Sequence, residues 1–220
     1  MRTPLIVANW KMNGTKLMVQ EWLQVVTTQL SASSTTDTAA CEWVFCPPSV
    51  YLDAASMLIK AANLSTLCLG AQNCHTAAHG AFTGEISANM LIDVGCRYVL
   101  VGHSERRQLF KESNAIVAEK IQAAQQAGLI PILCVGETAA ERQSNRTQTV
   151  IETQLAAALN DCQDKTKIGI AYEPLWAIGT GLTATPEQAQ VVHQQIRGWL
   201  AKNSKGLAGV VESSVAVNYV

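Results

Sequence analysis

The segment around Glu173 places a carboxylate where a buried strand is expected to end. An apolar run, residues 168–172, leads directly to Glu173, and Pro174 follows. Proline cannot extend a sheet ladder and disfavours helix at the residue before it, so the strand should stop at Glu173. A stiff apolar stretch and the flexible Gly179-Thr180-Gly181 come next. A base beside a hinged apolar flap is typical of chemistry shielded from water, although a strand-end glutamate can also be purely structural.

Two further segments carry polar groups just after apolar runs. Asn9 and Lys11 share strand parity, so both should point to the same side of the chain as it leaves the first strand. A cation and an amide there suit an anionic substrate such as a phosphate ester. The plain alternative is a solvated lysine beside a turn asparagine.

The third segment is Val101-Gly102-His103-Ser104-Glu105-Arg106-Arg107. Ser104 can cap the turn that follows, which sets His103 against exposed backbone N–H groups and the positive end of a helix dipole. That environment disfavours the imidazolium ion, so a neutral donor is expected near pH 7. A capping or surface histidine is the alternative. The charges that follow indicate either a solvated turn or an ion-pair network.

Other chemical signals are weaker. The spacing of His75 and His79 would suit a metal on a helix, but Gly80 and the lack of a nearby acidic ligand favour a loop without metal. The sequence has no P-loop, no G-x-S-x-G elbow and no G-x-G-x-x-G fingerprint, which argues against nucleotide binding and serine hydrolysis.

Composition describes an ordinary globular protein. Of 220 residues, 48% are hydrophobic and 15% charged, and the formal net charge is -1, which gives no electrostatic case for nucleic acid or an anionic membrane. No apolar run approaches a membrane span or resembles a signal peptide. Seven cysteines without a C-x-x-C pair are expected to be reduced core thiols of a cytoplasmic protein.

Short apolar runs alternate with helical patterns along the whole chain, which indicates β–α units around a parallel sheet in one domain, residues 1–220. Strands are expected at Leu5–Trp10, Trp43–Cys46, Leu67–Ala71, Tyr98–Val101, Ile130–Val135, Ile168–Tyr172 and Ser214–Val220. Helices are expected at Met18–Leu30, Tyr51–Ala62, Ala115–Ala127, Gln148–Leu159 and Glu187–Leu200.

Helix punctuation supports this map. Thr185-Pro186-Glu187-Gln188 offers an N-cap with a capping-box glutamine, and Gly128 suits a helix end. Composition does not choose between an open doubly wound sheet and a (β/α) barrel. In both, the carboxyl ends of the strands form the functional edge, which is where the three chemical segments fall.

Five segments together resemble the triosephosphate isomerase family, in the family's order and over residues 5 to about 188. They are Ala8-Asn9-Trp10-Lys11-Met12-Asn13, Gly80-Ala81-Phe82-Thr83-Gly84-Glu85, Val101-Gly102-His103-Ser104-Glu105-Arg106-Arg107, Cys134-Val135-Gly136-Glu137 and Tyr172-Glu173-Pro174-Leu175-Trp176-Ala177-Ile178-Gly179-Thr180-Gly181. Each could arise by chance, but all five in order are highly specific.

The resemblance implies a TIM (β/α)8 barrel that interconverts dihydroxyacetone phosphate and glyceraldehyde 3-phosphate in glycolysis and gluconeogenesis, with no cofactor and no metal. Glu173 would be the base and His103 the neutral electrophile. Lys11 would hold the charged substrate and stabilise the enediolate, while Asn9 orients it. Gly179 in the lid would donate its backbone N–H to the phosphate.

The resemblance also implies a homodimer in which the loop of residues 73–87 enters the neighbour's site. Thr83 would reach toward the partner's Asn9 and Lys11, and Glu85 would pair with Arg106. Glu105 is a further supporting residue.

The family pattern continues beyond the last residues of this sequence. Compared with it, the end of the seventh strand, the seventh helix, the eighth strand and the eighth helix are absent, including loops where such barrels commonly bind phosphate. The expectation is an incomplete stretch of an active enzyme. The alternatives are an inactive or weakly active dimerising fragment and a different sugar-phosphate enzyme on the same barrel.

Overall fold

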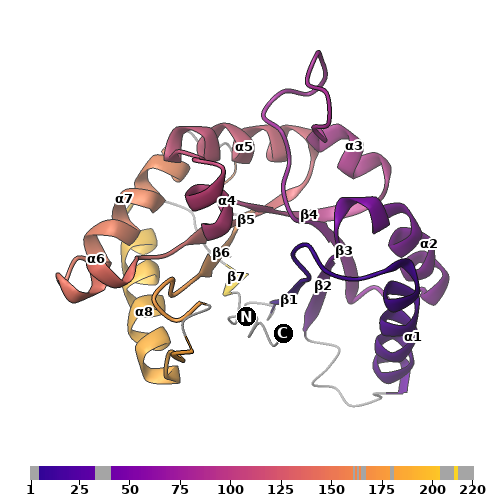
Figure 1. Ribbon diagram of the computed structural model, residues 1–220, viewed down its shortest axis with the longest axis horizontal. Helices are drawn as coiled ribbons and strands as arrows, with labels where there is room; N and C mark the ends of the chain where they lie inside the picture. Colours follow the sequence, from indigo (N-terminus) through magenta and orange to yellow (C-terminus); the bar gives the residue numbers. More distant parts are fainter. Residues whose placement is uncertain are drawn as a thin grey trace.

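The computed structural model describes residues 5–32, 41–160, 162, 164, 167–178 and 181–203, and the backbone of 211–212. In this part of the chain, seven parallel strands form one curved sheet whose spatial order follows the chain order (Figure 1). The strands are β1 Leu5–Asn9, β2 Glu42–Cys46, β3 Leu67–Ala71, β4 Cys96–Val101, β5 Ile130–Val135, β6 Gly169–Tyr172 and β7 Val211–Glu212.

Helices connect these strands along the outside of the curve (Figure 1). They are α1 Lys16–Ala32, η2 Ser49–Tyr51, α2 Leu52–Ala62, α3 Ala88–Asp93, α4 Ser104–Leu109, α5 Asn114–Ala127, α6 Ala139–Gln143, α7 Thr147–Leu159 and α8 Pro186–Asn203. A strand order without reversal distinguishes a (β/α) barrel from a doubly wound sheet. Of the two architectures compatible with the composition, the barrel is therefore confirmed.

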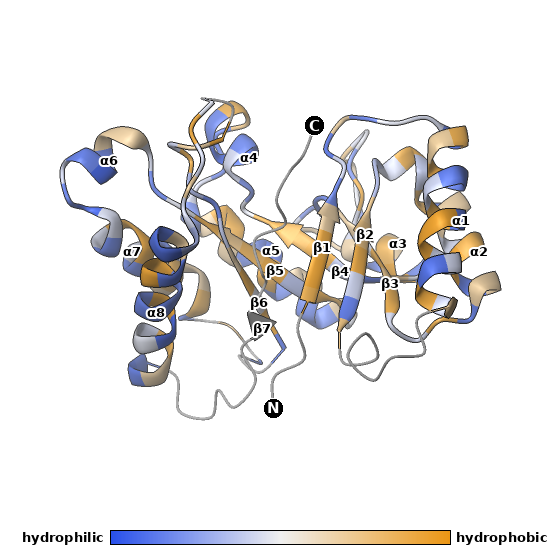
Figure 2. Cartoon of the chain, turned by 90° about the horizontal axis from the view of Figure 1, so that it is seen from below, coloured by the Kyte–Doolittle hydropathy of each residue, from blue (hydrophilic) through white to orange (hydrophobic). Residues whose placement is uncertain are grey.

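Side chains along each strand alternate between two apolar layers. Val44 and Cys46 of β2 lie in a cluster on the inner side of the sheet, whereas Phe45 lies in the larger cluster that the helices cover. On β4, Leu100 faces inward and Val99 outward in the same way. Because both faces are buried, the strands read as continuous apolar runs, as Figure 2 shows by their hydrophobic colouring.

Local punctuation fixes several helix ends as the sequence predicts. Thr185 and Gln188 form the expected capping box, with the Gln188 N–H donating to Thr185 Oγ1 at 3.2 Å and the Thr185 N–H donating to Gln188 Oε1 at 3.0 Å. Gly128 ends α5 with φ +94°, a conformation that favours glycine.

Some elements differ from the prediction. The short helices α3 and α6 were not expected, because five or six residues hold too little periodicity to stand out; the caps Ser87 and Thr138 start them. The expected turn after His103 is helix α4, but its N-cap is His103, whose side chain accepts the Glu105 N–H, and Ser104 is its first helical residue. The seventh strand is described at Val211–Glu212, ahead of the expected range, and residues 214–220 lie outside the described residues.

Three whole-chain expectations can be compared with the fold. No helix in the described ranges is long and apolar enough to cross a membrane. The seven cysteines, all in the described part of the chain, are thiols rather than disulfides, and six are buried. Residues 75–79 form a loop rather than a helix, and the described residues contain no group of three His, Cys, Asp or Glu side chains placed to hold a metal.

Candidate active site

Asn9 is the last residue of β1, and Lys11 follows it at the carboxyl edge of the sheet. Asn9 Oδ1 accepts the Lys11 backbone N–H at 3.0 Å, and Lys11 has φ +51°, a left-handed conformation that is rare outside glycine and asparagine. Gln72, just after β3, donates its side-chain amide to the Lys11 carbonyl and to the Cys46 carbonyl, both at 2.9 Å. These bonds hold the strained turn in place, so the direction of the lysine side chain is fixed by a residue 61 positions away.

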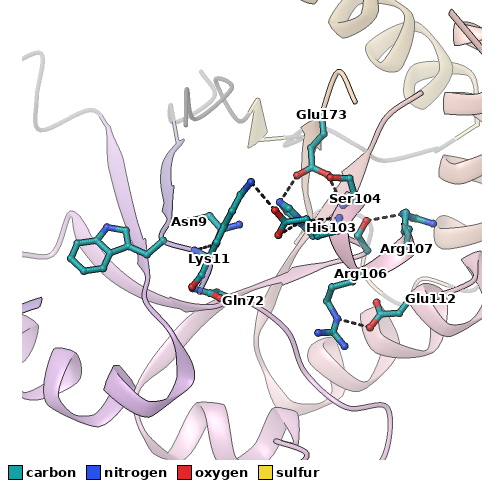
Figure 3. A network of polar contacts seen from close by, with 12 residues as sticks. Asn9, Lys11, Gln72, His103, Ser104, Arg106, Arg107, Glu112 and Glu173 are labelled. Atoms are coloured by element: carbon teal, nitrogen blue, oxygen red, sulfur yellow. Dashed lines mark hydrogen bonds and ion pairs between the residues drawn. The ribbon is translucent and has the colours of Figure 1, made fainter. Parts of the chain in front are cut away.

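The Lys11 side chain reaches toward the His103 segment (Figure 3). Its Nζ lies 2.9 Å from Glu105 Oε1, and the lysine side chain is only 22% exposed. The lysine therefore places a cation at the carboxyl edge of the sheet, where it pairs with a carboxylate whose side chain is 43% exposed.

His103 and Glu173 face each other directly (Figure 3). His103 Nε2 lies 2.8 Å from Glu173 Oε1, and the two side chains are 8% and 14% exposed. Glu173 Oε2 accepts the Ser104 backbone N–H at 2.8 Å. His103 Nδ1 accepts the Glu105 backbone N–H at 3.2 Å, so this nitrogen carries no proton and Nε2 is the donor. The arrangement is that of a neutral imidazole at the N-terminal end of α4.

The backbone of Glu173 is held by close packing against β5. Its N–H donates to Val135 O at 2.8 Å. A Cβ added at Gly136 would lie 1.9 Å from the Glu173 carbonyl oxygen, so only glycine permits this approach. The Gln154 side chain in turn bonds both the N–H and the C=O of Gly136, at 2.9 and 3.0 Å.

Glu137 anchors the segment that follows Glu173. Its carboxylate is fully buried, and Oε1 accepts from Tyr172 Oη at 3.0 Å and from Trp176 Nε1 at 3.1 Å, while Arg142 pairs with it at 3.0 Å. Burial and the charge of Glu137 raise the pKa of Tyr172, so the phenol remains a protonated donor. The first turn of the apolar flap is thus tied, through one carboxylate, to the segment that follows β5.

A second buried ionic group lies beneath the protruding loop. Glu112 Oε1 is 2.5 Å from both Arg106 Nε and Lys120 Nζ, and Lys120 also donates to Asn73 Oδ1 at 2.8 Å. Burial by itself raises the pKa of Glu112, but the hydrogen bonds and charges of Lys120 and Arg106 outweigh it, and the pKa is lowered. The base of the 73–87 loop is therefore fixed to α5 by a network of charged groups.

The sequence-predicted residues divide into three groups in space. Asn9, Lys11, His103, Glu105 and Glu173 lie together at one edge of the sheet. Thr83 and Glu85 are exposed on the loop that protrudes between β3 and α3 (Figure 1). Arg106 pairs with Glu112 inside the chain, while the Gly179 assignment lies outside the described residues.

Two residues of the site have no role in the sequence prediction. Gln72 was missed entirely, because a lone glutamine after a strand carries no recognisable signal. Glu137 stands in a quoted motif, yet nothing in the sequence reveals that its partners are the tyrosine before Glu173 and the indole after it.

The chain is similar to known proteins over nearly its full length. A family model of triosephosphate isomerase matches residues 4–214. The triosephosphate isomerase of Nitrosococcus oceani is 48% identical over 210 residues, which are 94% of this chain and 81% of that protein. The corresponding protein of Serratia proteamaculans is 45% identical over 96% of this chain and 80% of its own length. That of Shewanella halifaxensis is 47% identical over 93% of this chain and 78% of its length.

The family model covers almost the whole chain, and these relatives are between 45% and 48% identical to it. The chain belongs to the triosephosphate isomerase family.

Proposed function

We propose that this protein interconverts dihydroxyacetone phosphate and D-glyceraldehyde 3-phosphate by proton transfer through an enediolate. The observation that carries the proposal is the direct apposition of the Glu173 carboxylate and the neutral His103 imidazole at 2.8 Å, with the Lys11 ammonium on the same edge. An enolisation needs a base at carbon and a donor at the carbonyl oxygen, and these groups supply both.

The residues take distinct roles in this reaction. Glu173 removes a proton from one substrate carbon and returns it to the neighbouring carbon. His103 donates from Nε2 to the carbonyl oxygen, and its Nδ1 bond to the Glu105 N–H keeps that tautomer. Lys11 holds the charged substrate and stabilises the negative charge of the enediolate, and Asn9 fixes the turn that carries it. Gly179 would bind the phosphate from the lid.

A coupled assay in both directions tests this function. The unmodified chain should turn over both triose phosphates, and Glu173→Gln should lower kcat by about 10³-fold, within the range of lost general-base catalysis. Glu21→Gln, which removes an exposed carboxylate on α1, is the matched control and should change nothing. In D2O, the active chain should also place deuterium on carbon 1 of dihydroxyacetone phosphate. Turnover that survives Glu173→Gln would refute the assignment of the base.

We further propose that two copies associate through the 73–87 loop, so that Thr83 approaches the partner's Asn9 and Lys11, and Glu85 pairs with the partner's Arg106. In support, Phe82 on this protruding loop is 47% exposed. Its ring lies tilted against the ring of His75, with the two ring centroids 4.3 Å apart.

Charged substitutions at the tip of this loop test the association. Phe82→Asp combined with Thr83→Asp should yield weakly active monomers in analytical ultracentrifugation. Val191→Asp, at a comparably exposed apolar position on α8, should leave the association state unchanged. An intact dimer in the double variant would exclude this interface.

A further inference from the structure

Arg107 joins three elements beneath the candidate active site. Its Nε donates to the Gly102 carbonyl at 2.7 Å, and Nη1 donates to Asn114 Oδ1 at 2.6 Å at the start of α5. Nη2 lies 3.5 Å from the Cys134 carbonyl. One planar guanidinium therefore connects the ends of β4 and β5, and the proton transfers described above do not use it. Figure 3 shows Arg107 on the far side of His103 from Lys11.

The charge of Arg107 has no direct counterion in the described ranges, where no carboxylate oxygen lies within 4 Å of it. Arg97, Arg106 and Arg142, by contrast, each pair with a glutamate. Burial lowers the pKa of Arg107, and Glu173 is among the groups whose negative charge acts on it from a distance. Removing a guanidinium from water without a paired carboxylate has an unfavourable free energy, so a neutral side chain in this space would destabilise the fold less.

The guanidinium lies next to backbone segments that carry or hold both reacting side chains, His103 and Glu173. Gly102 has φ +69°, and a Cβ there would lie 2.8 Å from Arg107 Nη2, so the arginine packs directly on the residue before His103. On the other strand, the Cys134 carbonyl lies two residues before Gly136, which holds the backbone of Glu173. Arg107 thus contacts the backbone next to His103 and the strand end that leads to Gly136, against which the backbone of Glu173 packs.

We propose that Arg107 is a positioning residue for the isomerisation: its guanidinium fixes the ends of β4 and β5 relative to each other and thereby sets the separation of His103 and Glu173. It touches neither substrate nor reacting atoms. The inference rests on the proposed function and deepens it.

Steady-state kinetics on two variants give the first test. Arg107→Gln should lower kcat by about 10- to 100-fold, because small misplacements of reacting groups have effects of this size, while KM stays within about twofold. Arg107→Lys keeps the charge but loses the planar fork, so it should recover little of that loss. Full recovery by lysine, or a rise in KM at unchanged kcat, would overturn the positioning role. Arg97→Gln, at the opposite end of β4, is the matched control and should lower stability without changing kcat.

A second measurement does not depend on turnover. The proton on His103 Nε2 is held by Glu173, so its exchange with water, followed by nuclear magnetic resonance, should be at least about tenfold faster in both Arg107 variants than in the unmodified chain and in Arg97→Gln. Unchanged exchange would overturn the inference. An inactive unmodified chain would refute the proposed function, and the exchange rates would then decide the role of Arg107 alone.

Discussion

The contact between Gly136 and Glu173 allows a quantitative prediction for Gly136→Ala. The new Cβ would lie 1.9 Å from the Glu173 carbonyl oxygen, whereas such atoms essentially never approach within 3.0 Å. The Glu173 backbone must therefore retreat by about 1.1 Å, the difference between these distances. Gly136 itself has little room to yield, because Gln154 holds both its N–H and its C=O.

A displacement of this size acts on the base itself. A misplacement of about 1 Å can cost a factor of about 10² in rate, which corresponds to about 3 kcal/mol of activation free energy. We therefore expect kcat of Gly136→Ala to fall about 100-fold in the coupled assay. Overpacking should also lower the free energy of unfolding by about 1–3 kcal/mol, measured by urea titration.

Gly198→Ala on α8 is the matched control. A Cβ at Gly198 meets nothing within 4 Å, and alanine favours helix, so kcat should not change and stability should rise by about 0.5–1 kcal/mol. If Gly136→Ala kept kcat within about twofold of the unmodified chain, the close approach could not be what holds the base, and the reasoning would be wrong.

Three further predictions concern the supporting network. Gln72→Leu removes two hydrogen bonds that the side-chain amide donates, one of them to the carbonyl of Lys11, and should lower kcat/KM about tenfold in the same assay. An unchanged value would mean that the turn at Lys11 keeps its shape without Gln72. Glu137→Gln weakens the acceptor of the Trp176 indole and should lower the free energy of unfolding by about 2–3 kcal/mol in urea titrations; a loss below about 0.5 kcal/mol would contradict this. The pKa of Glu112 is lowered in the folded state, so its contribution is present above the unfolded pKa of about 4.3 and fades as the pH falls below it. Glu112→Gln should therefore be about 3 kcal/mol less stable at pH 7, and the difference should narrow as the pH falls below the unfolded pKa, whereas a gap independent of pH would rule out this linkage.

Much of the fold could be predicted from the sequence, because burial and turn signals are local. The strands Leu67–Ala71 and Ile130–Val135 have the predicted bounds, since each is an apolar run closed by polar or turn residues. The capping box at Thr185 was predictable for the same reason, since its partner lies three residues along the chain. The choice of a barrel came from the family resemblance, because composition fits both parallel architectures.

Contacts between distant residues were not predictable in this way. Gln72 and Arg107 act through carbonyl groups, and a carbonyl group is present at every position, so the sequence does not mark which one is bound. Arg106 is an instructive case: the family resemblance predicts a pair with Glu85, whereas the partner that the structure shows within the chain is Glu112, six residues away.

The sequence by itself determined which residue types stand at the strand ends, including the carboxylate of Glu173 before its proline and the imidazole of His103 just after an apolar run. The tertiary structure alone decided that these groups meet at 2.8 Å and that Lys11 joins them. The physical reason is that apolar periodicity specifies which side chains are buried, whereas the register and curvature of the sheet set which strand ends converge.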